Sequence, residues 1–249
     1  MRPQAFCFVV LLFAVVMPLG AKEIQLEGDF VQGGLVFGTT QPGSSVFLDG
    51  RALRLSAGGV FIVGFGRDAA PEGVLRVIGP DGVETVRKLA IAKREYDTQR
   101  INGLPPKLVT PPEEVLQRIR DEGTRVRTAR TFDMPETFFK EGFIWPAKGR
   151  ISGIYGSRRI LNGEPRQPHF GVDIAAPTGT PVIAPAGGEI RFAEPDLYYS
   201  GGTIILDHGH GLSSSFLHMS RIDVVVGQRV VQGEMVGAIG ATGRVTGAH

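Results

Sequence analysis

The chain has 249 residues, enough for one large domain or two modest ones, each able to bury a hydrophobic core. Its formal net charge is only +2, so the composition gives no sign of the basic face that nucleic-acid binding requires. The 35 glycines and 17 prolines exceed average usage and follow no collagen period, which predicts many short strands and tight turns. The composition therefore predicts a mostly β protein that does not bind nucleic acid.

Residues 1–21 have the pattern of a secretory signal peptide. Arg2 gives a positive start, residues 5–16 form an apolar run, and small residues up to Ala21 offer a cleavage site. The run is short for a membrane span, although an uncleaved anchor stays an alternative. The single cysteine, Cys7, lies in this segment, so the mature chain would hold neither a thiol nor a disulfide. We therefore expect an exported protein of the bacterial periplasm or cell envelope, without stable membrane insertion after cleavage.

Residues 22–92 alternate short β-rich runs with turn signals. The dipeptides Asp49-Gly50 and Asp81-Gly82 are typical of hairpin turns between strands. This spacing predicts an Ig-like β-sandwich of roughly seven strands. Because the segment contains no histidine and no catalytic cluster, we expect an accessory or binding domain. The predicted strands cover residues 23–26, 34–37, 45–48, 60–63 and 74–78.

Residues 93–131 are predicted to be a linker with one surface helix. Pro105 and Pro106 interrupt regular structure. Thr110 and Glu113 have the spacing of a capping box, with proline at the first helical position, and they predict a helix start. The apolar positions after it are sparse, which indicates a solvated helix. Its arginines, at positions 118, 120, 125, 127 and 130, suit either an anionic polymer or, as is more usual on a connector, solvent.

Residues 132–249 form the second predicted domain, and all five histidines of the chain lie in it. Short apolar runs separated by glycine-rich turns predict a mostly antiparallel, barrel-like sheet. Several runs end in a histidine beside a turn, where binding groups concentrate. Any imidazole chemistry therefore belongs to this domain.

The segment from Pro168 to Ile174 holds two good metal ligands, His169 and Asp173, four residues apart. Proline, glycine and β-branched residues in and around it favour a strand over a helix. Since side chains alternate along a strand, His169, Gly171 and Asp173 are expected on one face, with space above the glycine for a cation. From these residues alone, a metal site and a hydrogen-bonded pair beside a turn are equal alternatives.

Three segments in a fixed order carry a specific resemblance. They are His169-Phe170-Gly171-Val172-Asp173, Phe216-Leu217-His218-Met219, and the Gly-Ala-Thr-Gly-Arg-Val-Thr-Gly-Ala-His run of residues 240–249. They resemble the three signature motifs of the lysostaphin/LytM-type zinc endopeptidases. The resemblance covers roughly residues 140–249, and residues 149–158 are similar to the beginning of that family's domain.

The resemblance implies a zinc ion held by His169 and Asp173, and catalytic roles for His218 and His249. It also implies hydrolysis of peptide bonds in the stems or cross-links of bacterial peptidoglycan by a zinc-activated water. The family's third zinc ligand would lie two positions after His249. On this ground we expect a peptidase truncated within its last motif. A chain that truly ended here would bind metal weakly and turn over little substrate.

Two other function classes stay open. The same fold can serve as a non-catalytic cell-wall binding module or amidase activator, although such relatives usually lack several of the site residues that this chain has. The β-sandwich could instead be the functional binding domain, a hypothesis with no residue-level support.

Two of the histidines match none of the three motifs. His208 and His210 flank a turn beside Asp207, so we expect surface or turn histidines and a carboxylate that caps the turn.

Overall fold

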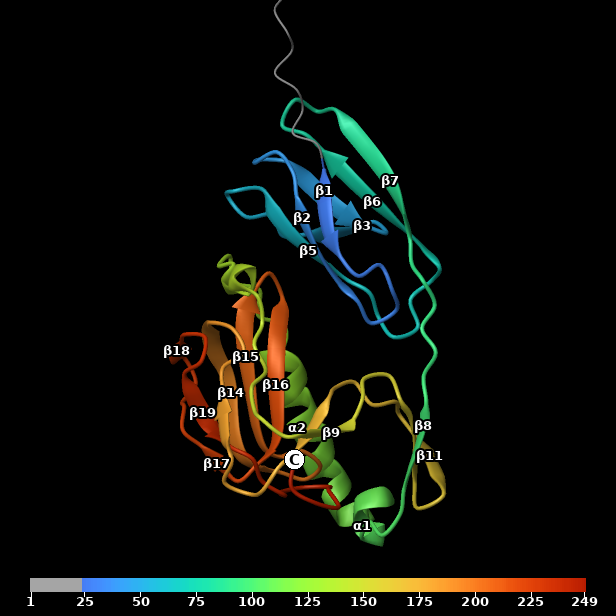
Figure 1. Ribbon diagram of the computed structural model, residues 1–249, viewed down its shortest axis with the longest axis vertical. Helices are drawn as coiled ribbons and strands as arrows, with labels where there is room; N and C mark the ends of the chain where they lie inside the picture. The colour runs from blue at the N-terminus through green and yellow to red at the C-terminus, as the bar shows by residue number, and fades with distance from the viewer. Residues whose placement is uncertain (1–23) are drawn as a thin grey trace, which may run out of the picture.

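The computed structural model describes residues 24–249, so the predicted signal peptide and Cys7 lie outside the described residues. Strands dominate, and the one long helix is α2 (Glu113–Ala129), which confirms the predicted mostly β fold (Figure 1). The strands form several small, curled sheets in which neighbouring strands run antiparallel, with one parallel pairing described below. Between residues 24 and 249, no helix has both the length and the apolar character needed to cross a membrane.

The N-terminal strands form two antiparallel sheets, ordered β1-β2-β5 and β4-β3-β6-β7. Both predicted hairpins are present, since Asp49-Gly50 joins β3 to β4 and Asp81-Gly82 joins β6 to β7. Asp49 and Gly50 have φ values of 49° and 81°, the positive values that a tight two-residue hairpin turn needs. The strands are β1 (Gln25–Gly28), β2 (Leu35–Thr39), β3 (Ser45–Leu48), β4 (Arg51–Leu53), β5 (Val60–Gly64), β6 (Glu72–Ile78) and β7 (Glu84–Ala90).

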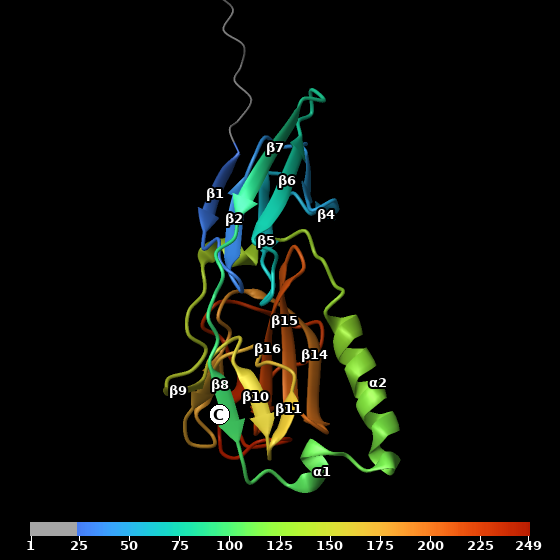
Figure 2. The same ribbon diagram turned by 90° about the vertical axis from the view of Figure 1, so that its right-hand side faces the viewer.

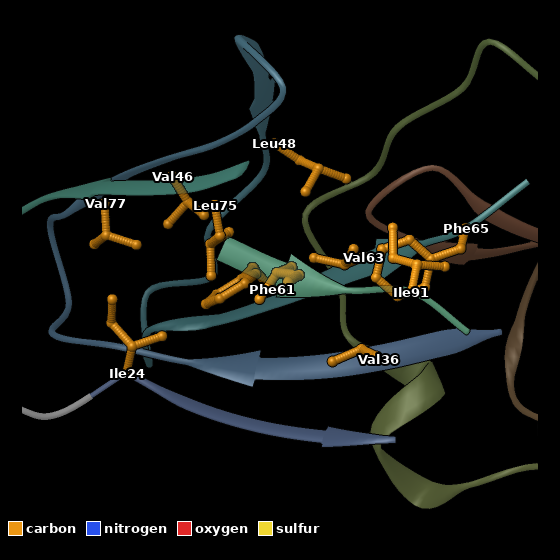
Figure 3. Packing of buried hydrophobic residues seen from close by; sticks show 11 residues of the cluster. Ile24, Val36, Val46, Leu48, Phe61, Val63, Phe65, Leu75, Val77 and Ile91 are labelled. Atoms are coloured by element: carbon orange, nitrogen blue, oxygen red, sulfur yellow. The ribbon is translucent and has the colours of Figure 1, made fainter. Parts of the chain in front are cut away.

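The two N-terminal sheets share one hydrophobic core (Figure 3). Phe61 of β5 is fully buried in it, together with Val36 of β2 and Leu75 of β6. Gly38 lies directly opposite Phe61 in the β2–β5 ladder, and a Cβ at this glycine would collide with the Phe61 ring. The absence of a side chain at Gly38 therefore leaves room for the Phe61 ring in this core.

The predicted linker contributes regular structure to the C-terminal part. β8 (Thr98–Ile101) pairs in parallel with β10 (Arg158–Leu161), and β10 pairs on its other side with β11 (Glu164–Arg166). A short helix that the sequence did not predict, α1 (Pro106–Val109), follows β8. The segment thus forms one edge of a sheet that also contains residues close to the predicted site.

α2 begins later than the capping-box pattern predicts. Thr110 is extended and ends α1, and the N-cap of α2 is Pro112, with no side-chain cap. A residue that precedes a proline is held out of the helical region, so the helix cannot start before the two prolines have passed. Val126 and Ala129 pack against Phe192, a side chain of β14 (Gly188–Leu197), and Figure 2 shows α2 beside β14. The helix is a surface element with one buried face.

The C-terminal strands surround a second core. The central sheet has the order β16-β15-β14-β18, and every residue of β15 is buried. Ile190, Ile204 and Leu206 are fully buried at its centre. The elements are η1 (Phe138–Glu141), β9 (Arg150–Gly153), β12 (Asp173–Ala175), β13 (Pro181–Ile183), β14 (Gly188–Leu197), β15 (Gly201–Gly209), β16 (Leu212–Met219), β17 (Arg221–Ile222), β18 (Arg229–Val230) and β19 (Met235–Ala238).

The N-terminal and C-terminal units are stacked along the long axis of the molecule (Figure 1). Arg54 forms a 2.7 Å ion pair with Asp133 at one point of contact. The rings of Phe37 and Phe139 stack with centroids 6.0 Å apart at a second. At a third, Arg67 donates a 2.7 Å hydrogen bond to the carbonyl of Gly156. The two units therefore meet through specific polar and aromatic contacts as well as through the chain that joins them.

Replacing Phe61 with alanine should lower the free energy of unfolding of the N-terminal unit by about 3–5 kcal/mol, because it leaves a cavity between two sheets. Urea denaturation followed by circular dichroism measures this change. Val86→Ala is the control, since Val86 is 55% exposed on β7 and its loss should cost less than about 0.5 kcal/mol. Equal losses in the two variants would contradict the assignment of Phe61 to the core.

Candidate functional site

His169 and Asp173 meet, but not on the straight strand that the sequence predicts. β12 begins only at Asp173, His169 lies in an irregular stretch, and the chain bends at Gly171. Along a straight strand, residues four apart are separated by about 13 Å. Here Nε2 of His169 lies 3.0 Å from Oδ1 of Asp173. The bend is therefore what brings the two side chains together.

A second glycine, Gly153 at the end of β9, makes room for this pair. It lies opposite Asp173 in the β9–β12 ladder. A Cβ at Gly153 would collide with the Asp173 carboxylate and would lie 3.1 Å from Cε1 of His169. The sequence motif locates Gly153 at the beginning of the domain but does not predict its role. A contact between two strands that are distant in the chain leaves no local sequence pattern.

The backbone of His169 is held by the turn before β10. The amide of Gly156 donates to the carbonyl of His169 (2.7 Å), and the amide of His169 donates to the carbonyl of Ser157 (2.9 Å). The N-terminal unit reaches this same turn through Arg67, whose guanidinium lies 4.3 Å above the ring of Tyr96. A Cβ at Gly156 would collide with Tyr96. The N-terminal unit thus packs directly on the turn that positions His169.

Arg159 of β10 contacts the other oxygen of the carboxylate, with Nη2 at 3.0 Å from Oδ2 of Asp173. Burial alone would raise the pKa of Asp173, but the hydrogen bond from His169 and the nearby positive charges, Arg159 among them, lower it below its ordinary value. Burial also lowers the pKa of the Arg159 guanidinium, although Asp173 opposes this. Asp173 is therefore ionised at neutral pH. No motif in the sequence marks Arg159 as part of the site.

His218 lies in β16 with a backbone φ of 62°, at an irregular end of the β15–β16 ladder. Its Nδ1 lies 2.8 Å from the carbonyl oxygen of Thr242. Since a carbonyl only accepts hydrogen bonds, Nδ1 carries the proton and Nε2 keeps a free lone pair. Burial lowers the pKa of His218 to about 4, against the opposing effect of the Thr242 carbonyl. The imidazole is therefore neutral at pH 7, with Nε2 as an acceptor.

His249 completes the group. Its Nδ1 lies 3.0 Å from the carbonyl oxygen of Gly247 and donates a hydrogen bond to it, as Nδ1 of His218 does to Thr242. Its Nε2 lies 3.8 Å from Oδ1 of Asp173, and its ring centroid lies 4.8 Å from that of His218. The structure therefore brings together the four residues His169, Asp173, His218 and His249.

The donor atoms His169 Nε2 and Asp173 Oδ1 have a spacing that suits a shared metal ion. Bonds of about 2.0–2.1 Å in a tetrahedral zinc site separate two ligand atoms by about 3.3 Å, close to the 3.0 Å observed. Nδ1 of His169 is buried and has no hydrogen-bond partner in the structure. Within residues 24–249, however, no group of three histidine, cysteine or acidic side chains has a geometry that could hold a metal. These residues thus fit two of the three protein positions of a catalytic zinc.

The prediction of surface or turn histidines is wrong for His208, which is buried in β15, whereas His210 lies in the turn as predicted but is also buried. His208 is 0% exposed and bonds through its two ring nitrogens to the Gly187 carbonyl (2.6 Å) and the Ser214 hydroxyl (2.8 Å). His210 lies in the turn, 9% exposed, with its ring edge against Phe139 of η1. Asp207 caps the turn as predicted, since Oδ1 accepts from the amide of Gly209 (2.9 Å). The two histidines are buried because η1 and the chain around it cover the end of β15.

Comparison with known proteins decides the family of the C-terminal part. Residues 167–249 match the model of the family described as Peptidase family M23. This segment is an M23 peptidase domain. All four residues of the group lie within it.

Some relatives that match this part of the chain are named as enzymes, and others are not. The chain is 38% identical over 104 residues to peptidoglycan DD-endopeptidase ShyA of Vibrio cholerae, a match that covers 41% of this chain and 24% of the relative. It is also 36% identical over 106 residues to cell division protein DipM of Caulobacter vibrioides, a match that covers 43% of this chain and 17% of the relative. The chain thus spans about a quarter or less of the length of these curated relatives.

The likeness to one solved structure extends beyond the M23 domain. A crystal structure of a peptidase M23 from Pseudomonas aeruginosa is 28% identical, with a TM-score of 0.68. The match covers 88% of this chain and 86% of that one. A match of this extent includes the N-terminal sheets, so the two proteins share the arrangement of both units.

Replacing Gly153 with alanine should displace Asp173 from His169, because the added methyl group occupies the space of the carboxylate. The expected result is the loss of the His169–Asp173 hydrogen bond, read from the imidazole signals of His169 by NMR. Gly66→Ala is the control, since no atom lies within 4 Å of a Cβ at that position. Unchanged His169 signals in the Gly153 variant would contradict this account of the site.

His218 should titrate with a midpoint near pH 4 in the folded, metal-free chain, below its ordinary value of 6.5. Because the unfolded chain then binds a proton that the folded chain does not, the contribution of this residue to stability should fall as the pH drops from about 6.5 to about 4. NMR titration of the His218 imidazole measures the midpoint. A midpoint near 6.5 would show that burial does not act on this ring as described.

Proposed function

We propose that the chain is a zinc-dependent endopeptidase that hydrolyses peptide bonds in the stems or cross-links of bacterial peptidoglycan. The observation that supports this most is the convergence of His169, Asp173, His218 and His249 within an M23 peptidase domain. The name of the endopeptidase relative supports peptidoglycan as the substrate. The predicted signal peptide supports the periplasm or cell envelope as the location.

His169 and Asp173 are the residues that would hold the zinc, and the third ligand of the family belongs two positions after His249. When bound, the ion would polarise the scissile carbonyl and make water acidic enough to attack near neutral pH. Asp173 suits this role because it stays ionised, and His169 because its Nε2 faces Asp173 at 3.0 Å. Arg159 holds the second oxygen of Asp173 and so orients the carboxylate.

His218 and His249 are proposed as the catalytic imidazoles. Each has Nδ1 bonded to a backbone carbonyl, which leaves Nε2 free to accept a proton from the attacking water. Once it is protonated, the same nitrogen can donate a hydrogen bond to the oxyanion that develops on the peptide carbonyl. The histidine that takes this proton can therefore also stabilise the developing charge, and the geometry suits either residue in this role.

A second candidate function is a non-catalytic cell-wall binding module or amidase activator. One relative of the M23 domain is named a cell division protein rather than an enzyme. The two functions differ in whether the fold, once it has a full ligand set, binds zinc and cuts.

The test compares the 249-residue chain with the same chain carrying a Leu-His dipeptide after His249. We expect the extended chain to bind one zinc per molecule and to release peptides from purified peptidoglycan. In it, His169→Ala and Asp173→Ala should lose both zinc and cleavage, whereas His218→Ala should keep zinc and lose about 10²-fold or more in rate. Asp196→Asn is the control, since that carboxylate is 80% exposed at its side chain.

Zinc content is read by atomic absorption and cleavage by chromatography of released fragments. If the His169→Ala or Asp173→Ala variant still cleaves peptidoglycan, the zinc-peptidase proposal is wrong. A folded, zinc-loaded extended chain that cuts nothing would favour the binding or activator function.

A further inference from the structure

Two arginines face each other beside the proposed site. Arg159 of β10 lies directly opposite Arg166 of β11 in the antiparallel ladder. Directly opposed residues project from the same face of a sheet with Cβ atoms about 4.5–5.5 Å apart, and like charges in this position are destabilising. The pairing therefore calls for a compensating negative charge.

A third arginine adjoins them from the last motif. Nη1 of Arg244 donates to the carbonyl of Leu108 (3.3 Å), and Nη2 of Arg166 donates to the next carbonyl, that of Val109 (3.0 Å). Because the two guanidinium groups bond to consecutive carbonyls at the end of α1, they lie side by side. We refer to Arg159, Arg166 and Arg244 as the arginine cluster.

The carboxylates around the arginine cluster do not balance it. Arg159 pairs with Asp173, which is itself a proposed zinc ligand. Arg166 approaches Glu164 only at 3.8 Å, and the Glu164 side chain is 60% exposed. Among the ion pairs of residues 24–249, none includes Arg244, whose guanidinium lies 4.3 Å from the Tyr199 ring centroid instead. The cluster thus carries an excess of positive charge.

The surroundings of Arg244 add to this imbalance. Burial, together with repulsion from Arg159 and Arg166, lowers the pKa of Arg244, while Tyr199 opposes the shift. A guanidinium has five N–H donors, and the structure uses one of those on Arg244, which leaves the rest for a ligand. A partly buried cation with free donors favours an anion.

The arginine cluster also lies next to the proposed catalytic residues. The amide of Arg244 donates to the carbonyl of Tyr199 (2.8 Å), and the amide of His218 donates to the next carbonyl, that of Ser200 (2.7 Å). Arg159 contacts Asp173 directly at 3.0 Å. An anion bound by the arginine cluster would therefore lie close to the peptide bond that is cleaved, and we take it to be part of the same substrate molecule.

We propose that the arginine cluster binds a free carboxylate of the peptide substrate, with Arg244 and Arg166 as the residues that select it. This inference rests on the proposed function and deepens it. A planar guanidinium fork matches a carboxylate with two parallel hydrogen bonds. The substrate class is then a peptide with an α- or side-chain carboxylate near the scissile bond, and an amidated peptide of the same sequence is disfavoured.

The test measures binding, so that it does not depend on cleavage. The probes are a synthetic cross-linked stem peptide with free carboxyl groups and its fully amidated counterpart, titrated calorimetrically into the whole 249-residue chain. We expect the free acid to bind about tenfold or more tightly than the amide, the effect of one charge-assisted hydrogen-bonded pair. Arg244→Gln and Arg166→Gln should remove this preference while changing the affinity for the amide less than about threefold.

Arg120→Gln is the matched control, because it removes the same charge from the exposed side of α2, where Arg120 bonds only to Gln117. Arg244→Lys tests whether charge alone suffices, and we expect it to restore only part of the preference. Thermal melts of each variant check that α1 stays anchored.

Three outcomes of the binding test would overturn the proposal. One is equal binding of acid and amide by the unaltered chain. Another is an equal loss for both probes in Arg244→Gln, which would leave the arginines as anchors of α1. The last is no binding of either probe. If the extended chain cuts peptidoglycan but shows no acid preference in KM, the proposed function stands and this inference fails.

Discussion

The 3.0 Å contact between His169 and Asp173 is the interaction on which the rest of the site depends. This contact depends on the backbone conformation around the two residues as well as on their side chains. Gly171 supplies the bend that folds the segment back, and Gly153 leaves the strand opposite without a side chain where the carboxylate lies. Arg159 then fixes the second carboxylate oxygen. Without these three residues, the pair of ligand types in the sequence would not form a site.

The N-terminal unit belongs to the support of this pair. Arg67 bonds to the carbonyl of Gly156, and the amide of the same Gly156 bonds to the carbonyl of His169. A chain of hydrogen bonds therefore runs from the first unit to a proposed ligand. Any change in how the two units meet at this point acts on the position of His169, whereas the Arg54–Asp133 contact lies elsewhere on the interface.

Local chemistry was predictable from sequence, and long-range geometry was not. The hairpins at Asp49-Gly50 and Asp81-Gly82 follow from turn residues, and the mostly β fold follows from composition and spacing. The family resemblance named all four residues that the structure brings together. The part played by Gly153 and Arg159 depends on strands that are distant in sequence. The burial of His208 likewise depends on how η1 covers β15, which no local pattern reports.

The parallel pairing of β8 with β10 limits how the C-terminal domain can be transferred between genes. The segment that matches the family model begins at residue 167, yet β10 and β9 precede it, and β8 and α1 precede them. β9 contains Gly153 and β10 contains Arg159. Carbonyls of α1 accept hydrogen bonds from Arg166 and Arg244. A gene fusion that transferred only the matched segment would carry the four site residues but leave Gly153 and Arg159 behind. A transferred segment that kept the pairing of β8 with β10 would include the chain from Thr98 onward, well upstream of the recognisable motifs.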